Sequence, residues 1–188
     1  TRRFVASVGS NIRPLPNNVL TLSPTIYWQR NWDHYQWKRG MTGGNKGENY
    51  HRTDVYGGAL NTVVNWALGK TALGADLRKE LIYSTAYGET LPANQWKTIH
   101  GSDRMYERRG ERTNTSLFLE HNVVLQHFTL SAGLLANHNT WLSGGLHFYP
   151  GVDLAWRPNA QWKVYASWNK ALRLPTYTDL YISNRAQM

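Results

Sequence analysis

Apolar and polar side chains alternate with a period of two along most of this sequence, in eight segments separated by turn residues. Successive side chains of a β-strand point to opposite faces, so each segment predicts a strand with one apolar and one polar face. The predicted strands cover residues 2–8, 19–38, 52–68, 71–85, 112–124, 128–137, 145–156 and 161–172. Helical periodicity is nearly absent. We therefore expect an all-β fold, an antiparallel meander of about eight strands.

The predicted connections alternate between short and long. Short turns are expected at Gly69-Lys70, Gln126-His127 and Asn159-Ala160, and longer loops at residues 39–51, 86–111 and 138–145. In an antiparallel meander the short turns then lie at one end and the loops at the other. This rhythm is typical of outer-membrane barrels, which have short periplasmic turns and long extracellular loops. Pro24 has no ladder donor inside the second strand, which predicts a bulge there.

The aromatic composition also favours a membrane setting. Nine Trp and eleven Tyr stand against four Phe, and Trp and Tyr gather where an apolar surface meets water. Five tryptophans fall near strand ends on the apolar faces, as an aromatic girdle would: Trp28, Trp66, Trp156, Trp162 and Trp168. The mean hydropathy of −0.56 argues against a transmembrane helix, but not against a barrel, whose alternating strands average to polar. A soluble β-sandwich stays open, because periodicity does not tell which face is outside.

Charged residues concentrate on the polar faces of the predicted strands. We expect these side chains to face a barrel lumen or a domain that plugs it: Asp76, Arg78, Glu80, Glu120, Asp153, Asn169 and Arg173. On a lipid face an Arg or Lys at mid-depth would cost about 2–4 kcal/mol. Acids and arginines of the fourth and fifth strands are expected to form salt-bridge ladders. Lys79 falls on the apolar parity, so either it snorkels at an interface or the predicted register slips there.

The net charge of +9 concentrates in two predicted loops, around residues 38–52 and 97–112. No nucleic-acid-binding motif accompanies these residues, and contact with acidic lipopolysaccharide or an anionic ligand explains the charge better. The seven histidines form no HxH or HExxH motif and cysteine is absent, so neither a metal site nor a cofactor is predicted. His147, Asp153 and Ser167 have the residue types of a hydrolytic triad. Such coincidences are expected among many polar residues, and we predict no enzyme.

The predicted loops carry the best candidates for ligand contacts. Aromatic side chains can stack on a large amphipathic ligand at low entropic cost. The candidates are Trp32, Tyr35, Trp37, Tyr50, Trp96, Tyr106 and Trp141. For the first three of these, a place in the girdle at the outer interface is an equal alternative.

Residues 167–181, SWNKALRLPTYTDLY, resemble a signature of TonB-dependent receptors that reads roughly S-x-N/G-x-A-x-R-x-P-T/S-x-x-E/D-L-Y. Residues 27–35 (YWQRNWDHY), 49–54 (NYHRTD) and 118–122 (FLEHN) are also similar to the cobalamin-receptor branch of this family. The resemblance covers nearly the whole chain. It implies that residues 1–188 are one partial barrel domain, about eight transmembrane strands of a 22-stranded barrel. The plug domain, the TonB box and the closing strands are expected outside this sequence.

The signature also has a physical interpretation. Arg173 shares the inward parity of Asn169, Pro175 ends strand pairing because it lacks an N–H, and Asp179 can accept from Arg173 or from backbone N–H groups. We expect these residues to anchor a loop rather than to contact a ligand.

The resemblance implies a function and partners. The expected function is active uptake, at the Gram-negative cell outer membrane, of a large scarce nutrient: cobalamin first, a siderophore or haem next. Expected partners are the TonB energy-transducing complex, reached through the plug, the lipid bilayer with its lipopolysaccharide, the nutrient, and a surface lipoprotein. Two alternatives stay open, a small self-contained eight-stranded barrel for adhesion or envelope structure and a passive porin.

Overall fold

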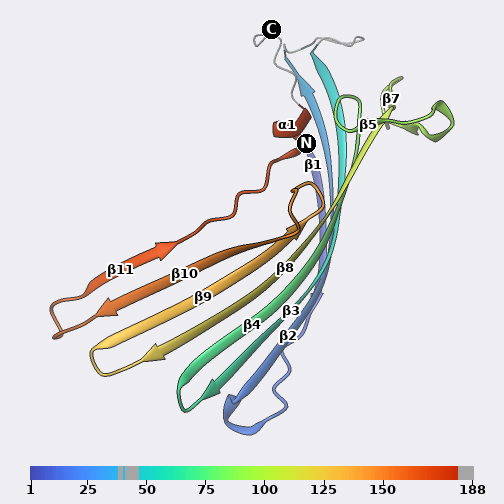
Figure 1. Cartoon of the computed structure of the whole chain (residues 1–188). Coiled ribbons are helices and arrows are strands. Elements are labelled where there is room, and N and C mark those ends of the chain that lie inside the picture. Colours follow the sequence, from blue (N-terminus) through green and yellow to red (C-terminus); the bar gives the residue numbers. More distant parts are fainter. Residues whose placement is uncertain (38–39, 41–46, 182–188) are drawn as a thin grey trace.

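The computed structural model describes residues 1–37, 40 and 47–181. Its main sheet has eight long strands in chain order, each antiparallel to its neighbours. These strands are β1 (Arg2–Gly9), β2 (Leu20–Gln36), β3 (Glu48–Trp66), β4 (Gly69–Ser84), β8 (Arg108–Val124), β9 (Phe128–Asn139), β10 (Leu146–Trp156) and β11 (Val164–Asn169). Together they form one strongly curved sheet (Figure 1). The predicted all-β antiparallel meander is confirmed.

The outermost strands do not pair with each other, because β1 pairs with β2 and β11 with β10. This chain therefore forms an open sheet and not a small closed barrel. The short turns lie together at one end of the sheet, and the connections after β4 and β9 lie at the other (Figure 1). We name these the turn end and the loop end. Most of the predicted loop 39–51 lies outside the described residues.

Two strands extend further into the loop end than predicted. β3 begins at Glu48 rather than residue 52, and β8 begins at Arg108 rather than residue 112. Their pairing with β4 continues to His51↔Ser84 and Ser84↔Arg108, through polar residues that show no alternation. Backbone hydrogen bonds thus extend the ladder where side-chain patterning gives no signal.

The predicted loop 86–111 contains short elements of its own. These are β5 (Glu89–Thr90), which pairs with β8, a 3₁₀ turn η2 (Ala93–Gln95), and the two-stranded hairpin of β6 (Lys97–Thr98) and β7 (Met105–Tyr106). A further 3₁₀ turn, η1 (Pro16–Asn18), lies in the connection from β1 to β2. The last strand is shorter than the predicted 161–172, and the helix α1 (Tyr177–Tyr181) that follows it was not predicted.

The bulge predicted at Pro24 is absent. Pro24 pairs with Leu60 without any offset in the register of β2 and β3. Its carbonyl accepts from the backbone N–H of Ser10, 3.1 Å away, just past the last residue of β1. The backbone nitrogen of Pro24, which has no hydrogen to donate, therefore faces the position where β1 has ended. Proline is tolerated at such an unpaired strand edge because no ladder hydrogen bond is lost.

The register sorts side chains onto two faces. The polar face carries Asp76, Arg78, Glu80, Glu120, Asp153 and Asn169, and the apolar face carries Leu73, Leu77, Leu117, Leu119, Leu130, Leu134, Val152, Leu154, Val164 and Ala166. Tyr177 of α1 contacts Glu80 on the polar face, and α1 lies on the concave side of the sheet while the β6–β7 hairpin lies on the convex side (Figure 1). The polar face is thus concave and the apolar face convex.

Lys79 lies on the convex face, as its parity predicts, and the register does not slip there. It pairs with Tyr56 across β3 and β4, and its Nζ lies 3.6 Å from Glu111 Oε2 near the loop end. Among the described residues no helix is long and apolar enough to cross a membrane.

Glycines on the concave face make room for large side chains of the neighbouring strand. A Cβ on Gly57 would lie 2.1 Å from Tyr27 Cζ, and one on Gly74 would lie 1.9 Å from Phe118 Cε1. The two aromatic rings therefore lie flat over bare backbone. Gly58, on the convex face, is different, because its nearest neighbour would be 3.8 Å from an added Cβ.

This difference gives a matched prediction within one strand. Gly57→Ala should lower the free energy of unfolding of the full-length protein by about 1–3 kcal/mol, since the Tyr27 ring must move and loses its contact with Asp76. Gly58→Ala should be neutral or slightly stabilising, by roughly 0.5 kcal/mol, because the methyl group fits. Urea unfolding in lipid vesicles measures both. Equal losses in the two variants would contradict the proposed packing of Tyr27.

Candidate functional site at the loop end of the concave face

The buried side chains of the sheet gather at its loop end rather than in its middle. Among them are charged and amide groups that rarely lose contact with water: Glu80, Arg112, Asn114, Asn137 and Asn139, all less than 9 % exposed. A buried polar group is costly unless it is hydrogen-bonded. The partners of these side chains therefore define what the loop end of the concave face is built to hold.

Glu80 lies between two arginines. Its Oε2 accepts from Arg112 Nε at 2.7 Å, and its Oε1 lies 2.7 Å from Arg78 Nη2. The Glu80 and Arg112 side chains are both buried, whereas the Arg78 side chain is 35 % exposed. Two guanidinium groups and one carboxylate leave this trio with one positive charge on the concave face.

A cluster of asparagines continues the network across β8 and β9. Asn137 Nδ2 donates to Asn114 Oδ1 at 3.0 Å and to Ser116 Oγ at 2.9 Å, and Asn139 Nδ2 donates to the same Asn114 oxygen at 3.1 Å. Asn139 Oδ1 accepts from the backbone N–H of Trp141 at 2.9 Å and so fixes the start of the next loop. The amides therefore hold β8, β9 and the loop after β9 in one arrangement.

Residues 170–181, which we name the strap, cross the concave face from β11 back to β4 and β8 (Figure 1). Arg112 Nη1 donates to the carbonyl of Pro175 at 2.6 Å, and the Tyr177 hydroxyl donates to the Glu80 carbonyl at 3.4 Å. The strap begins α1 with reciprocal bonds: Thr176 N–H donates to Asp179 Oδ2 at 2.8 Å and Asp179 N–H to Thr176 Oγ1 at 3.1 Å. One arginine thus joins the buried acid to the strap.

Aromatic rings form a row beneath and beside the strap. His51 stacks on Tyr87 with ring centroids 4.5 Å apart, Tyr87 lies 6.4 Å from Tyr181, and Trp141 meets Tyr181 at 6.2 Å and Tyr177 at 4.7 Å, both edge to face. The Arg112 guanidinium lies 5.1 Å from the centre of the Trp141 ring and 5.3 Å from that of Tyr177. Four segments that are distant in sequence therefore meet in one aromatic surface.

Two ionisable groups of the strap have shifted pKa values. Burial raises the pKa of the Tyr177 phenol, and the nearby Glu80 carboxylate adds to this effect. The hydroxyl therefore stays protonated as a hydrogen-bond donor. Hydrogen bonds from Thr176 lower the pKa of the Asp179 carboxyl. The Asp179 cap is thus present at neutral pH and is lost only as the pH falls through that lowered value.

The remaining residues of the predicted polar set are spread over the concave face. Asp76 accepts from the Tyr27 hydroxyl at 3.3 Å, Glu120 accepts from Asn122 at 2.7 Å and Ser131 at 3.2 Å, and Asp153 accepts from Ser167. Asn169 Nδ2 donates to Ser167 Oγ at 2.7 Å. Arg173 is exposed on the strap, outside the buried network.

The expected salt-bridge ladder between β4 and β8 is only partly correct. Glu80 joins Arg78 as expected, but its second partner is Arg112, and Glu120 instead accepts hydrogen bonds from Asn122 and Ser131. Glu120 pairs with Ala72, eight residues along β4 from Glu80. This spacing of roughly 26 Å is too long for an ion pair.

The predicted ligand-contact aromatics separate into three groups. Trp141 lies in the aromatic row of the concave face. Trp32, Tyr50 and Tyr106 lie on the convex face, where Tyr50 stacks on His34 at 4.2 Å and Tyr106 is buried against Arg52. Tyr35, Trp37 and Trp96 are exposed, and Trp96 Nε1 donates to the Leu91 carbonyl of its own loop at 2.9 Å.

Sequence reasoning missed Arg112 and Tyr177. Arg112 has the parity of Asn114 and Ser116, so extending the predicted polar face by one pair would have found it. Tyr177 lies inside the TonB-receptor signature, but 97 residues separate it from Glu80. No local pattern predicts that contact.

Comparison with known protein families matches residues 1–187 to the TonB dependent receptor-like β-barrel. No curated protein matches this chain. Among solved structures, the ferric citrate transporter FecA in its unliganded form is similar, with a TM-score of 0.61 and 14% identity over 88% of this chain. The likeness shows the fold, and this chain spans 26% of the FecA chain. Because the family match runs over nearly its whole length, this chain belongs to the TonB dependent receptor-like β-barrel family.

Proposed function

We propose that this chain is part of the barrel wall of an outer-membrane receptor that imports a large scarce nutrient with energy supplied through TonB. The observation that carries the proposal is the two-faced sheet, with its leucines on the convex face and a hydrogen-bonded polar network on the concave face. A wall of this kind separates lipid from a polar interior.

The height of the convex face supports the membrane placement. Tyr56 stacks on Trp28 toward the loop end, and Trp66 packs on His121 at the turn end. The ten residue-to-residue steps from Tyr56 to Trp66 span roughly 33 Å along β3. A strand tilted by about 40° then covers roughly 25 Å of membrane. That is about the height of the apolar band of an outer-membrane barrel, with aromatic side chains at both borders.

We propose that the nutrient is bound at the loop end of the concave face. The aromatic row gives flat surfaces for a large amphipathic molecule, and the Arg78–Glu80–Arg112 trio leaves a positive charge for an anionic group. The cobalamin-like segments of the sequence favour cobalamin as the nutrient, with a siderophore or haem next. The fold is similar to that of FecA, a ferric citrate transporter, which is consistent with a metal chelate as the nutrient.

The transport proposal is tested by uptake in cells that carry the full-length receptor. Radiolabelled cobalamin, a ferric siderophore and haem should be offered to cells with and without TonB. We expect uptake of one of them that requires both the receptor and TonB. Uptake that persists without TonB would instead support the passive porin.

Trp141→Ala should weaken binding of the imported nutrient to the full-length receptor about tenfold, because the Tyr177 and Arg112 side chains lose the ring between them. Trp96→Ala is the matched control, since its ring lies in a loop near the convex face and bonds to its own loop. Equilibrium binding to purified receptor distinguishes the two. Equal losses would remove the concave face as the binding site.

A further inference from the structure

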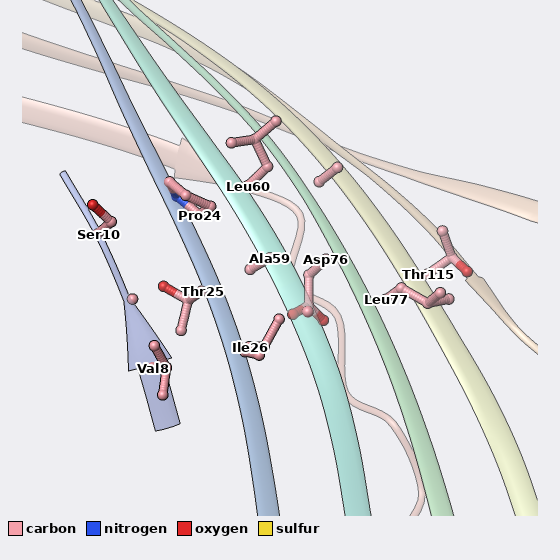
Figure 2. A pocket seen from close by; sticks show the side chains of 13 residues that line it. Val8, Ser10, Pro24, Thr25, Ile26, Ala59, Leu60, Asp76, Leu77 and Thr115 are labelled. Carbon is pink, nitrogen blue, oxygen red and sulfur yellow. The ribbon is translucent and has the colours of Figure 1, made fainter. Parts of the chain in front are cut away.

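His51 of β3 is a partly buried histidine at the loop end of the concave face. Its surroundings are unlike those of the convex face further along the sheet. There a hollow of about 520 Å³ is lined mainly by apolar side chains, among them Val8, Ile26, Leu60 and Leu77 (Figure 2). The His51 ring stacks on Tyr87, with the two planes 3° from parallel, and Tyr87 lies beside Tyr181 of the strap. A change in the charge of His51 therefore acts directly on the aromatic row.

Ser84 determines where the hydrogen of neutral His51 lies. The Ser84 Oγ atom accepts from the backbone N–H groups of Ala86 and Tyr87, both at 2.8 Å, and we name residues 84–87 the Ser84 turn. A hydroxyl group has two acceptor positions and one hydrogen. Its own hydrogen is therefore left for His51 Nδ1, which is also 2.8 Å away. Nδ1 is thus the acceptor, and neutral His51 carries its hydrogen on Nε2.

A proton on His51 Nδ1 is incompatible with this arrangement. The imidazolium ion donates from both ring nitrogens, so its Nδ1–H would point at an oxygen whose acceptor positions are already filled. Either the bond between His51 and Ser84 breaks, or Ser84 gives up its bond to Ala86 or to Tyr87. Ser84 is fully buried, so water does not replace the lost bond. In both cases the Ser84 turn loses part of what holds the Tyr87 ring in place.

The groups around His51 determine how readily it gains a proton. Asp33 of β2 pairs with His51 and favours the imidazolium ion, whereas the cation Arg108 of β8, which pairs with Ser84, opposes it. The other titratable groups nearby on this face are the phenols of Tyr35, Tyr87 and Tyr181. Burial outweighs Asp33 and lowers the pKa of His51. The bond between His51 and Ser84 therefore stabilises the fold fully above the ordinary histidine pKa of about 6.5, and this contribution is lost as the pH falls through the lowered value.

We propose that His51 is an acid-sensitive latch of the loop end: when its imidazole gains a proton, the Ser84 turn opens and Tyr87 leaves the aromatic row. The latch itself depends only on contacts within this chain. Its consequence for uptake rests on the proposed function, because the aromatic row is the surface proposed to hold the nutrient. Acid then weakens nutrient binding by removing one ring from that surface, while the ladder between β3 and β4 stays intact.

Amide hydrogen exchange of the full-length receptor in detergent micelles tests the latch without any nutrient. The protection factors of the Ala86 and Tyr87 amides, which correct for the direct effect of pH on exchange, should fall about tenfold between about pH 7.5 and about pH 4.5. His51→Asn places an amide oxygen where Nδ1 lies but cannot gain a charge, so its protection should stay constant over this range. Ser84→Ala removes the acceptor of both amides and should lack this protection at either pH.

His34→Gln is the matched control, because His34 is also a loop-end histidine but lies on the convex face, where its Nε2 contacts Glu48 at 2.7 Å. This variant should keep the full acid response of Ala86 and Tyr87. The proposal is overturned if His51→Asn responds to acid as wild type does, or if His34→Gln loses the response. Should His51→Asn fail to fold, wild-type protection that does not change with pH overturns it equally.

Binding measurements on the same samples separate the latch from the transport proposal. The probes are cobalamin, a ferric siderophore and haem, each at both pH values. A probe that binds at about pH 7.5 should bind more weakly at about pH 4.5 to wild type but not to His51→Asn. If the latch opens in a receptor that binds none of the three, the transport proposal fails and the latch stands.

Discussion

Arg112→Met should lower the free energy of unfolding of the full-length receptor by about 3 kcal/mol, at the low end of the cost of breaking a buried ion pair. The substitution keeps an unbranched apolar stem but removes the guanidinium donors to Glu80 and to Pro175. Arg78 still contacts Glu80, which limits the loss. Urea unfolding in lipid vesicles, followed by tryptophan fluorescence, measures the change.

Arg109→Met is the matched control three residues earlier on the same strand. Arg109 forms an equally short pair with Glu111, at 2.6 Å, but the two side chains are 41 % and 48 % exposed. An exposed pair contributes less than about 1 kcal/mol, because water solvates both charges after the pair is broken. Similar losses in both variants would mean that the stabilising effect of the Arg112 ion pair does not depend on its burial. The strap would then not be held by a buried network of low dielectric.

The Arg112 variant should also change the strap. Pro175 loses its donor, and Tyr177 and Trp141 lose the cation over their rings. A spin label at Thr178, an exposed residue of α1, should therefore become more mobile in the Arg112→Met receptor than in Arg109→Met. An unchanged spectrum would place the anchoring of the strap in its aromatic contacts alone.

Most strands of this fold could be predicted from the sequence because apolar side chains occupy the convex face through the middle of the sheet. They produce the alternation seen from Leu117 to Val123 and from Leu130 to Leu134. The rule fails at the loop end. Residues 108–111 continue the ladder with β4, but their side chains do not alternate. A strand that has backbone pairing but no apolar face shows no alternation of polar and apolar residues in its sequence.

The candidate site could be predicted only where its residues lie on strands. The alternation along the fourth predicted strand places Glu80 and Arg78 on the polar face. The contact of Tyr177 with Glu80 depends instead on the path of the strap across four strands. The burial of Asp54 depends in the same way on a hairpin that folds back over the convex face. Contacts of this range are set by loop conformation, which the residues between them do not specify.

Leu119→Arg should impair insertion of the full-length receptor severely, because it places a charge near the middle of the convex face. Leu119 pairs with Leu73, which pairs with Thr62, close to midway between Tyr56 and Trp66. An arginine facing hydrocarbon at this depth costs about 2–4 kcal/mol. The amount of heat-modifiable receptor in outer-membrane fractions measures assembly, and we expect it to fall several-fold.

Glu120→Arg introduces the same side chain one residue later, on the concave face. Among the described residues, the carboxylate that it replaces accepts hydrogen bonds only from Asn122 and Ser131. The residues that pair with position 120 on the two neighbouring strands, Ala72 and Gly133, are small and leave room for the longer side chain. A polar interior hydrates the new charge, so assembly should stay close to wild type. If Glu120→Arg were excluded from the membrane and Leu119→Arg inserted, the concave face would have to meet lipid. The charged network around Glu80 would then lie in hydrocarbon, and the barrel-wall interpretation, with the transport it supports, would have to be abandoned.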